Sequence, residues 1–559
     1  MIRKYNVRWI VCLFLCLAMV GCTNDEIVQD NDEEQRHKVQ DKEDALDIDI
    51  TSYGEEIGFK LESPTKQTNH TETSLDLKGS IEKTDELNEH FIWVIIEKNA
   101  KIDVINDDQF EYYIPIKENK FSEQINLHHG KGDYQITVRL PSNEENEEDI
   151  YYDGAMFSVT NQSSDIERDI QYGKYGVEQD LTLSKPVKGW NEMKETVLVE
   201  GTVSEEYKGD LMLIEIEKDG ESKEMLIPVK DNTFSREIPL YFGEGYHLIR
   251  LRLLADDRED LFYESASFYV NNQSSKEFAD MKQSSNFFDS GINLETPGWD
   301  VAATQKEKEY SISGTIDQDA PGADTVSHLI VKVTQMEEEA ESTYVIPVVD
   351  YKFEGTAYFR FGPGDYQVTI NVPAEEQKDP SVYTFSSVLD IYHEVTTVED
   401  ERGLLPSRGI ESDHPAIIKK AEHITSGIEN DREKAKAIYE FVSRHVAYDV
   451  EKAENDIFDI DDSAVATLEL GTGICQDYTF LTTALLRAVD IKSHYVEGYA
   501  GERHAWVEAN LDGEWIEMDP TWGAGYVQDG QFHFQYNEDY FDPEEEFLAE
   551  THTREGIMY

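Results

Sequence analysis

Three residues in the last fifth of the chain, Cys475, His504 and Asp519, have the types and the order of a nucleophile, its base and the group that orients the base. A thiolate attacks a carbonyl carbon, an imidazole carries the proton, and a carboxylate holds the imidazole in one orientation. The other three cysteines lie within the first 22 residues. If that segment is cleaved and Cys22 is modified, Cys475 has no partner for a disulfide. We therefore interpret Cys475 as a thiol that is used chemically.

The sequence around Cys475 predicts that the thiol lies at, or one residue inside, the N-terminus of a helix. A glycine turn, Gly471-Thr472-Gly473, precedes it, and apolar residues at helical spacing follow from Leu481 onward. Free amide groups and the helix dipole at such a position favour a thiolate. The same amides can hold a developing oxyanion.

His504 and Asp519 lie on two alternating runs that are joined by an Asp-Gly step, which is typical of a two-residue hairpin. With Leu511 opposite Glu514, the two residues share one face as diagonal neighbours, with Cβ atoms roughly 7 Å apart. An imidazole–carboxylate hydrogen bond can span that separation. The opposite face is apolar, so we expect it to be core and the His504 face to meet the cysteine helix.

Three blocks of sequence now stand together: Gly473-Ile474-Cys475-Gln476-Asp477-Tyr478, His504-Ala505-Trp506 and Asp519-Pro520-Thr521-Trp522. They resemble the signature blocks of the transglutaminase-like superfamily, and the resemblance covers about residues 400–559. It implies an α+β domain with a papain-like core, in which a helix bearing cysteine packs on an antiparallel sheet bearing histidine and aspartate. It also implies that Cys475 is the nucleophile, His504 the general base and acid, and Asp519 the orienting residue.

The resemblance further implies a cysteine acyltransferase, peptidase or amidase that forms a thioester on Cys475 from a carboxamide or peptide bond. An amine acceptor would then give a cross-link, whereas water would give deamidation or proteolysis. Gln476 and Tyr448 are further candidates for the substrate site. Trp506 and Trp522 are candidates too, either as walls of the acyl site or as packing beside the hairpin. Neither a metal nor an organic cofactor is predicted, although a Cys, a His and an Asp could in principle hold zinc.

The remaining histidines, such as His494, His533 and His552, have no predicted partner and are expected to be structural or at the surface. Nothing in their spacing indicates a metal site. We therefore assign them no role in the predicted chemistry.

One pattern recurs three times before residue 400. An Ile-Pro step is followed by Phe six residues after the proline, and by a Gly-x-Gly turn that begins fifteen residues after it. The runs between turns alternate apolar and polar residues and are rich in Ile, Val, Tyr and Phe, which predicts antiparallel, Ig-like β-sandwiches. We expect them over residues 74–180, 190–290 and 305–398, with the prolines on edge strands. Their aromatic residues are expected to be core, and the modules to be spacers.

The N-terminus predicts a bacterial lipoprotein. A basic start and a short apolar run over residues 1–21 have the layout of a signal peptide, and Ala18-Met19-Val20-Gly21-Cys22 resembles a lipobox. That resemblance implies cleavage before Cys22 and lipid attachment to its thiol, which would anchor the protein to the membrane at the cell surface. The alternative is an ordinary signal peptide with an incidental cysteine. Residues 22–73 are predicted to be an acidic, disordered tether.

The formal charge of −66, from 116 acidic and 50 basic residues, excludes nucleic-acid binding because a polyanion would be repelled. The predicted partners are the membrane and a protein or peptidoglycan-linked amide substrate. An alternative from a different class is a non-catalytic adhesion or assembly lipoprotein, in which the β-repeats bind a partner and the last domain is a relic.

Overall fold

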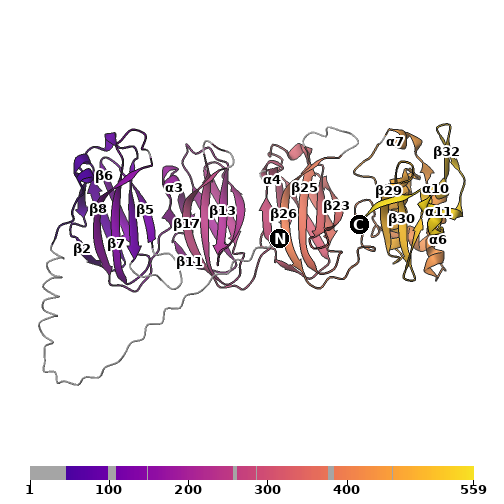
Figure 1. The fold of residues 1–559 in the computed structure, drawn as a ribbon, viewed down its shortest axis with the longest axis horizontal. Helices are drawn as coiled ribbons and strands as arrows, with labels where there is room; N and C mark the ends of the chain where they lie inside the picture. The colour runs from indigo at the N-terminus through magenta and orange to yellow at the C-terminus, as the bar shows by residue number, and fades with distance from the viewer. Residues whose placement is uncertain are drawn as a thin grey trace, which may run out of the picture. The chain divides into compact units, whose positions relative to one another are not determined.

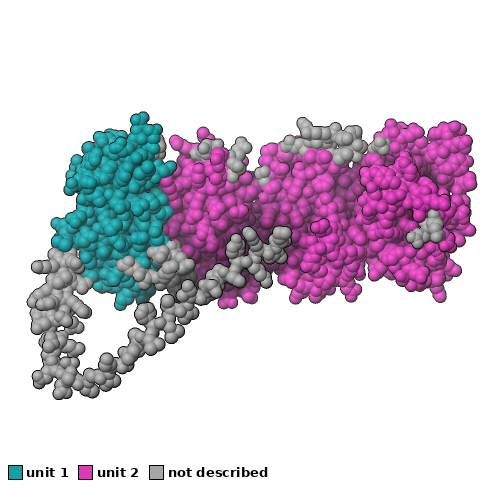
Figure 2. All heavy atoms as spheres, viewed as in Figure 1, with its two compact units in different colours: residues 1–166 teal, residues 167–559 magenta. Residues whose placement is uncertain are grey.

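The computed structural model describes residues 46–98, 109–147, 149–255, 258, 261–284, 286–374, 383–455 and 457–559. These residues fall into two compact units that divide after residue 166 (Figure 2). Unit 1 holds one β-sandwich, and unit 2 holds two more followed by an α+β domain (Figure 1). The predicted fold class is therefore confirmed. The predicted signal peptide, Cys22 and residues 23–45 of the predicted tether lie outside the described residues.

The first sandwich packs a three-stranded sheet, β1-β3-β6, against a five-stranded sheet, β2-β8-β7-β4-β5, around one apolar core. All pairs are antiparallel except β2 with β8. Its elements are α2 (Ser52–Ile57), β1 (Lys60–Ser63), β2 (Thr68–Thr71), β3 (Ser74–Ser80), η1 (Thr84–Glu86), β4 (Phe91–Lys98), β5 (Gln109–Pro115), β6 (Lys120–Asn126), β7 (Gly132–Pro141) and β8 (Tyr151–Asn161).

The prediction that residues 22–73 form a disordered tether is wrong for residues 46–73, which supply α2, β1 and β2. Ile57 and Phe59 are almost fully buried in the sandwich core. The stretch is polar on average, but most of its apolar residues pack against the core and its backbone pairs with the sheets. The average composition of residues 22–73 therefore did not indicate that part of the stretch is folded.

The second sandwich repeats this plan with sheets β10-β12-β15 and β11-β17-β16-β13-β14, and β9 pairs with β17. Its elements are β9 (Gln171–Tyr172), α3 (Lys174–Glu178), β10 (Thr182–Lys185), β11 (Trp190–Met193), β12 (Thr196–Thr202), β13 (Leu211–Lys218), β14 (Glu221–Pro228), β15 (Thr233–Pro239), β16 (Gly245–Leu254) and β17 (Phe262–Asn272).

The third sandwich differs because β23 continues past its proline and pairs with β24, which joins the two sheets. Its elements are β18 (Asp280–Gln283), α4 (Asn286–Asp289), β19 (Ile292–Thr296), β20 (Thr304–Gln305), β21 (Glu309–Ile316), η2 (Ala323–Thr325), β22 (His328–Gln335), β23 (Ala340–Val349), β24 (Lys352–Tyr358), β25 (Gly364–Pro373) and β26 (Phe385–Val395). The Ile-Pro steps lie on the edge strands β5 and β14 in the first two sandwiches, as predicted.

The repeated phenylalanine is a core residue in each sandwich, and its ring lies over a glycine on the paired strand. The cross-strand pairs are Gly79 with Phe121, Gly201 with Phe234, and Gly314 with Phe353. A Cβ atom on these glycines would lie 2.3–2.7 Å from the Cζ atom of the ring. The repeat therefore includes a glycine that the sequence pattern did not reveal, and its role is to make room for the ring.

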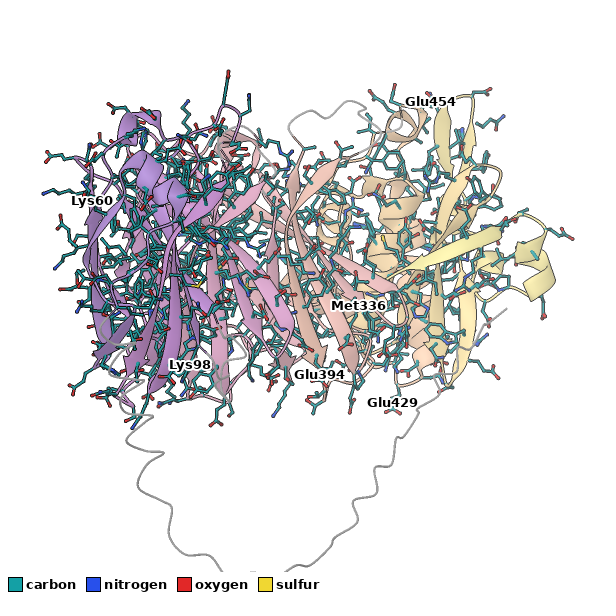
Figure 3. All side chains as sticks on the ribbon, turned by 60° about the vertical axis from the view of Figure 1, so that its left-hand side comes forward. Lys60, Lys98, Met336, Glu394, Glu429 and Glu454 are labelled. Atoms are coloured by element: carbon teal, nitrogen blue, oxygen red, sulfur yellow. The ribbon has the colours of Figure 1, made fainter. Side chains whose placement is uncertain are left out.

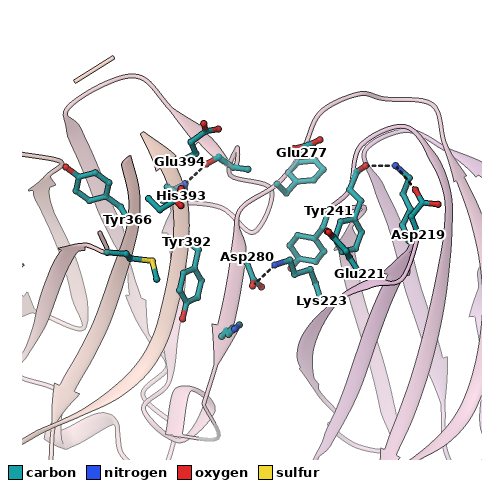
Figure 4. A pocket seen from close by; sticks show the side chains of 17 residues that line it. Asp219, Glu221, Lys223, Tyr241, Glu277, Asp280, Tyr366, Tyr392, His393 and Glu394 are labelled. Atoms are coloured by element: carbon teal, nitrogen blue, oxygen red, sulfur yellow. Dashed lines mark hydrogen bonds and ion pairs between the residues drawn. The ribbon is translucent and has the colours of Figure 1, made fainter. Parts of the chain in front are cut away.

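An open cavity of about 680 Å³ lies between the second and third sandwiches, within unit 2 (Figure 4). Charged side chains line it, and Lys223 and Asp280 form an ion pair of 2.9 Å there. Glu394, Glu429 and Glu454 are exposed and project from unit 2 into solvent (Figure 3).

The α+β domain has a four-stranded sheet, β31-β30-β29-β34, beside the buried helix α9. Its elements are α5 (Pro415–Ile424), α6 (Asp431–His445), β27 (Ala447–Tyr448), α7 (Val450–Glu454), α8 (Ala464–Leu470), β28 (Thr472–Gly473), α9 (Cys475–Arg487), β29 (Ser493–Tyr499), β30 (Arg503–Leu511), β31 (Glu514–Met518), α10 (Pro520–Ala524), β32 (Gly525–Gln528), β33 (Gln531–Phe534), η3 (Glu538–Tyr540), α11 (Glu545–Ala549) and β34 (Thr553–Met558). Among the described residues, no helix combines the length and the apolar character needed to cross a bilayer.

Two buried arginines join the third sandwich to this domain. Arg360, with no exposed surface, donates to the carbonyl oxygens of Arg402, Leu405 and Pro406. Arg487, on α9, donates to the same Leu405 carbonyl at 2.8 Å. Buried guanidinium groups need such partners because their charge is costly to desolvate. The connecting segment is therefore clamped from both domains.

Candidate active site

Cys475 is the first residue of α9, as predicted, and it is partly exposed. The helix begins there because the carboxylate of Asp477 accepts the N–H of Ile474 at 2.7 Å. Gly473 makes this possible, since a Cβ atom on it would lie 2.4 Å from the Cβ atom of Asp477. Gly471 ends the preceding helix in the left-handed conformation (φ 65°). The two glycines thus set the start of α9, which in turn places the thiol.

Asp477 is itself held by Lys452, at 2.9 Å, and Lys452 also pairs with Asp462 at 2.7 Å. Gln476 donates to the other oxygen of Asp462 at 3.2 Å. Burial raises the pKa of Asp477 although Lys452 opposes that change. This network ties α7 and the loop before α8 to the residues beside the thiol.

The hairpin β30–β31 has the register that the sequence predicted, with Leu511 opposite Glu514 and Val507 opposite Met518. Asp512 and Gly513 both have positive φ, 57° and 94°, as a two-residue turn of this kind requires. Asp519 then ends the hairpin and caps α10. Its Oδ1 atom accepts the N–H groups of Thr521 and Trp522 at 2.9 and 3.1 Å.

His504 donates to or shares a proton with Asp519 across 2.8 Å, from Nε2 to Oδ2. Both side chains are buried, and Asp519 has no exposed surface. Burial disfavours the imidazolium, but the charge and hydrogen bond of Asp519 and the nearby Cys475 thiol outweigh it and raise the pKa of His504 to about 10. The same ion pair holds the pKa of Asp519 below its usual range despite burial. Because Nε2 of His504 contacts Asp519, Nδ1 is the ring nitrogen that can interact with the Cys475 thiol.

The expected placement of the helix is wrong in one respect. The body of α9 shares its apolar core with the opposite, apolar face of the hairpin, which contributes Ala505, Val507, Ala509 and Leu511. His504 meets Cys475 only at the N-terminal end of the helix, where both line one cavity. Apolar burial determines which face the helix covers, and the polar pair meets at its end.

That cavity has a volume of about 610 Å³, and its lining includes two of the four predicted substrate-site residues, Tyr448 and Gln476. Burial raises the pKa of Tyr448, and the neighbouring Cys475 and Glu502 act in the same direction. The described residues that line it are Tyr448, Ala453, Phe458, Ile474, Cys475, Gln476, Tyr495, Glu497, Gly498, Glu502, Arg503, His504 and Ala505.

Trp506 and Trp522 do not line the cavity and instead pack around the histidine–aspartate pair. Trp506 is 1% exposed, and its N–H donates to Glu517 at 3.0 Å. The ring of Trp522 lies 5.8 Å from that of His504. Their rings pack beside His504, Trp506 from β30 and Trp522 from α10, which agrees with the packing alternative.

His552, for which the sequence predicted no partner, is buried, and its Nε2 atom lies 3.2 Å from Asp519 Oδ2. The local sequence carries no signal for this contact, because His552 reaches the site only through the pairing of β34 with β29. His504, Asp519 and His552 bring three potential metal ligands within 4.8 Å of one another. The two histidines each lie at hydrogen-bond distance from Asp519.

Residues 418–520 match the model of the transglutaminase-like superfamily. They form a transglutaminase-like domain. The match spans the helix that carries Cys475 and the hairpin that carries His504 and Asp519, so the predicted resemblance is confirmed at the level of the domain.

Similar proteins match part of the chain. Mouse kyphoscoliosis peptidase is 30% identical over 139 residues, which cover 22% of this chain and 21% of the relative, and the human protein is 29% identical over 138 residues with the same coverage. The chain thus spans about a fifth of the length of these relatives. A crystal structure of a candidate cysteine protease from Cytophaga hutchinsonii is 22% identical, covers 40% of this chain and 69% of that chain, and has a TM-score of 0.21.

Proposed function

We propose that the transglutaminase-like domain catalyses acyl transfer from protein or peptide amides through a thioester on Cys475. The observation that carries the proposal is the buried 2.8 Å contact between His504 and Asp519 at one wall of the cavity that also holds the thiol. An imidazole oriented by a carboxylate beside a cysteine at a helix N-terminus is the arrangement that activates a thiol for attack.

The reaction begins when His504 holds the thiol proton as an imidazolium and the Cys475 sulfur attacks the carbonyl carbon. The first amide groups of α9 have no acceptors within the helix, so they are suited to stabilise the oxyanion. The C–N bond then breaks, His504 gives its proton to the leaving ammonia or amine, and a thioester remains. Water or a second amine, deprotonated by His504, attacks the thioester and restores the thiol.

The outcome of the second step distinguishes cross-linking from deamidation or proteolysis. We further propose that the domain acts at the bacterial cell surface, anchored through a lipid on Cys22, because residues 1–22 have the layout of a lipoprotein signal. The β-sandwiches would then hold the domain away from the membrane. Protein or peptidoglycan-linked amides are the substrates that such a position makes available.

Mass spectrometry of cell-surface proteins from a wild-type strain and a Cys475→Ala strain tests this proposal. Cross-linked peptides that have lost ammonia, deamidated glutamines or new chain termini should occur only in the wild type. If the two strains give the same peptides, while deletion of residues 75–400 causes a strong defect, the non-catalytic adhesion role is supported instead.

A further inference from the structure

His552 completes the set of hydrogen bonds around Asp519. Asp519 has two carboxylate oxygens and no exposed surface. Oδ1 accepts two backbone N–H groups, and Oδ2 contacts Nε2 of His504 at 2.8 Å and Nε2 of His552 at 3.2 Å. A buried carboxylate needs several donors to stay ionised. His552 is the one donor of the four that comes neither from the backbone nor from His504.

The other ring nitrogen of His552 lies 2.8 Å from the hydroxyl of Thr551. The same hydroxyl also lies 3.3 Å from the carbonyl oxygen of Leu548. When the hydroxyl donates to the closer Nδ1 atom, Nε2 carries the ring proton and donates it to Asp519. The imidazole is also held by packing. Its ring centroid lies 5.1 Å from that of Trp506 and 4.8 Å from that of Trp522. Its orientation is thus determined from three sides.

The sheet is built so that His552 can reach Asp519. Gly498 on β29 pairs with His504 on one side and with Arg554 of β34 on the other. A Cβ atom on Gly498 would lie 2.1 Å from the carbonyl oxygen of Thr553 and 2.9 Å from the ring of Trp506. The absence of a side chain at Gly498 lets Trp506 lie across β29 and contact His552.

We propose that His552 is a positioning residue for the acyl-transfer reaction, which holds Asp519 so that Asp519 keeps His504 directed at Cys475. The inference rests on the proposed function. With donors on both oxygens, the carboxylate cannot rotate about its Cβ–Cγ bond, so the His504 ring stays in one orientation. Hydrogen bonds to charged groups contribute about 1.5–3 kcal/mol, which corresponds to a tenfold to hundredfold effect on an activated state that depends on them.

Two substitutions separate the hydrogen bond from the packing. His552→Phe keeps an aromatic ring between the tryptophans but removes the donor, whereas His552→Gln keeps an N–H donor. The assay is the rate at which iodoacetamide alkylates Cys475 in the full chain at mildly acidic pH, followed by intact mass. His494→Phe is the control, because His494 is equally buried, at 8% exposed, and lies outside the cavity lining.

We expect His552→Phe to slow alkylation at least tenfold, His552→Gln to recover most of the rate, and His494→Phe to match the wild type. Equal rates for wild type and His552→Phe would overturn the inference while leaving the proposed function intact. The inference would also be overturned if both His552 variants lost the same fraction of the alkylation rate and their melting temperatures fell together with it. That result would indicate a structural role alone. Stoichiometric zinc in the purified protein that is lost on substitution of His552 would likewise overturn the inference. A wild-type rate no faster than that of a peptide thiol would refute the proposed function itself.

Discussion

Replacing Asp519 by asparagine removes a charge and leaves the shape of the side chain unchanged. The carbonyl oxygen of the new amide can still accept the N–H groups of Thr521 and Trp522, so α10 keeps its cap. Its NH₂ group would face Nε2 of His504, which must then accept a hydrogen bond. The proton of the neutral imidazole would move to Nδ1, the nitrogen needed to hold the thiol proton.

The size of the effect follows from the pKa of His504. Asp519 and its surroundings raise that pKa from 6.5 to about 10, which corresponds to a preference for the imidazolium of about 5 kcal/mol at 1.36 kcal/mol per pKa unit. Without the carboxylate, only Cys475 opposes the effect of burial, so the pKa of His504 falls. We therefore expect Asp519→Asn to reduce Cys475 alkylation by iodoacetamide at pH 6 at least tenfold. Triad carboxylate-to-amide changes reduce turnover by about 10⁴ through the same tautomer effect.

The assay is the second-order alkylation rate from pH 5 to 9, measured by intact mass, with melting temperature as the test of folding. Asp512→Asn is the matched control, because Asp512 is exposed in the hairpin turn and Asn-Gly suits that turn equally well. A folded Asp519→Asn variant that reacts at the wild-type rate at pH 6 would refute the reasoning, since the imidazolium would then not depend on Asp519.

Three further predictions concern Gly473 beside the thiol, Arg360 between two domains and the buried His393. Gly473→Ala should slow Cys475 alkylation and lower the free energy of unfolding by roughly 1–2 kcal/mol, because the new Cβ atom displaces the Asp477 cap. Gly556→Ala is the control: its new Cβ atom would have no contact under 3.5 Å, so neither quantity should change. Arg360→Met should lower the free energy of unfolding by about 1–3 kcal/mol and separate the melting of the third sandwich from that of the transglutaminase-like domain; calorimetry that shows one unchanged transition would contradict the clamp. Burial lowers the pKa of His393 to about 4, so its contribution to stability is present above pH 6.5 and is lost as the pH falls toward 4. Urea unfolding should show the wild type losing about 3 kcal/mol more than His393→Gln between pH 7 and 4, and parallel losses would disprove that assignment.

Much of the site was predictable because its elements are local. The Asp512-Gly513 turn sets the hairpin register, and a strict two-residue period then places His504 and Asp519 on one face. The glycine turn before Cys475 likewise predicts where α9 begins. These features depend on residues within about fifteen positions of one another, so a sequence pattern can carry them.

The remaining features depend on distant pairings. His552 lies in the site because β34 pairs with β29, and no periodicity near residue 552 predicts that pairing. Alternation along β30 puts Trp506 on the same face as His504, but its ring packs beside the histidine and its N–H donates to Glu517, a contact that the local pattern does not predict. The helix α9 covers the apolar face because the large buried area there outweighs a single polar contact. The folded segment at residues 46–73 was missed because its few apolar residues gain their partners from strands far along the chain.

The central claim is that Cys475 becomes acylated. The most direct measurement is intact-mass and peptide-mapping mass spectrometry of the purified chain after brief incubation with a library of glutamine-containing peptides at mildly acidic pH, quenched with acid. We predict an acyl group on Cys475 in the wild type, its accumulation when acceptor amine is withheld, and its absence in Cys475→Ala. Turnover of the same peptides by Cys475→Ala at the wild-type rate, or turnover with Cys475 unmodified throughout, would contradict the account.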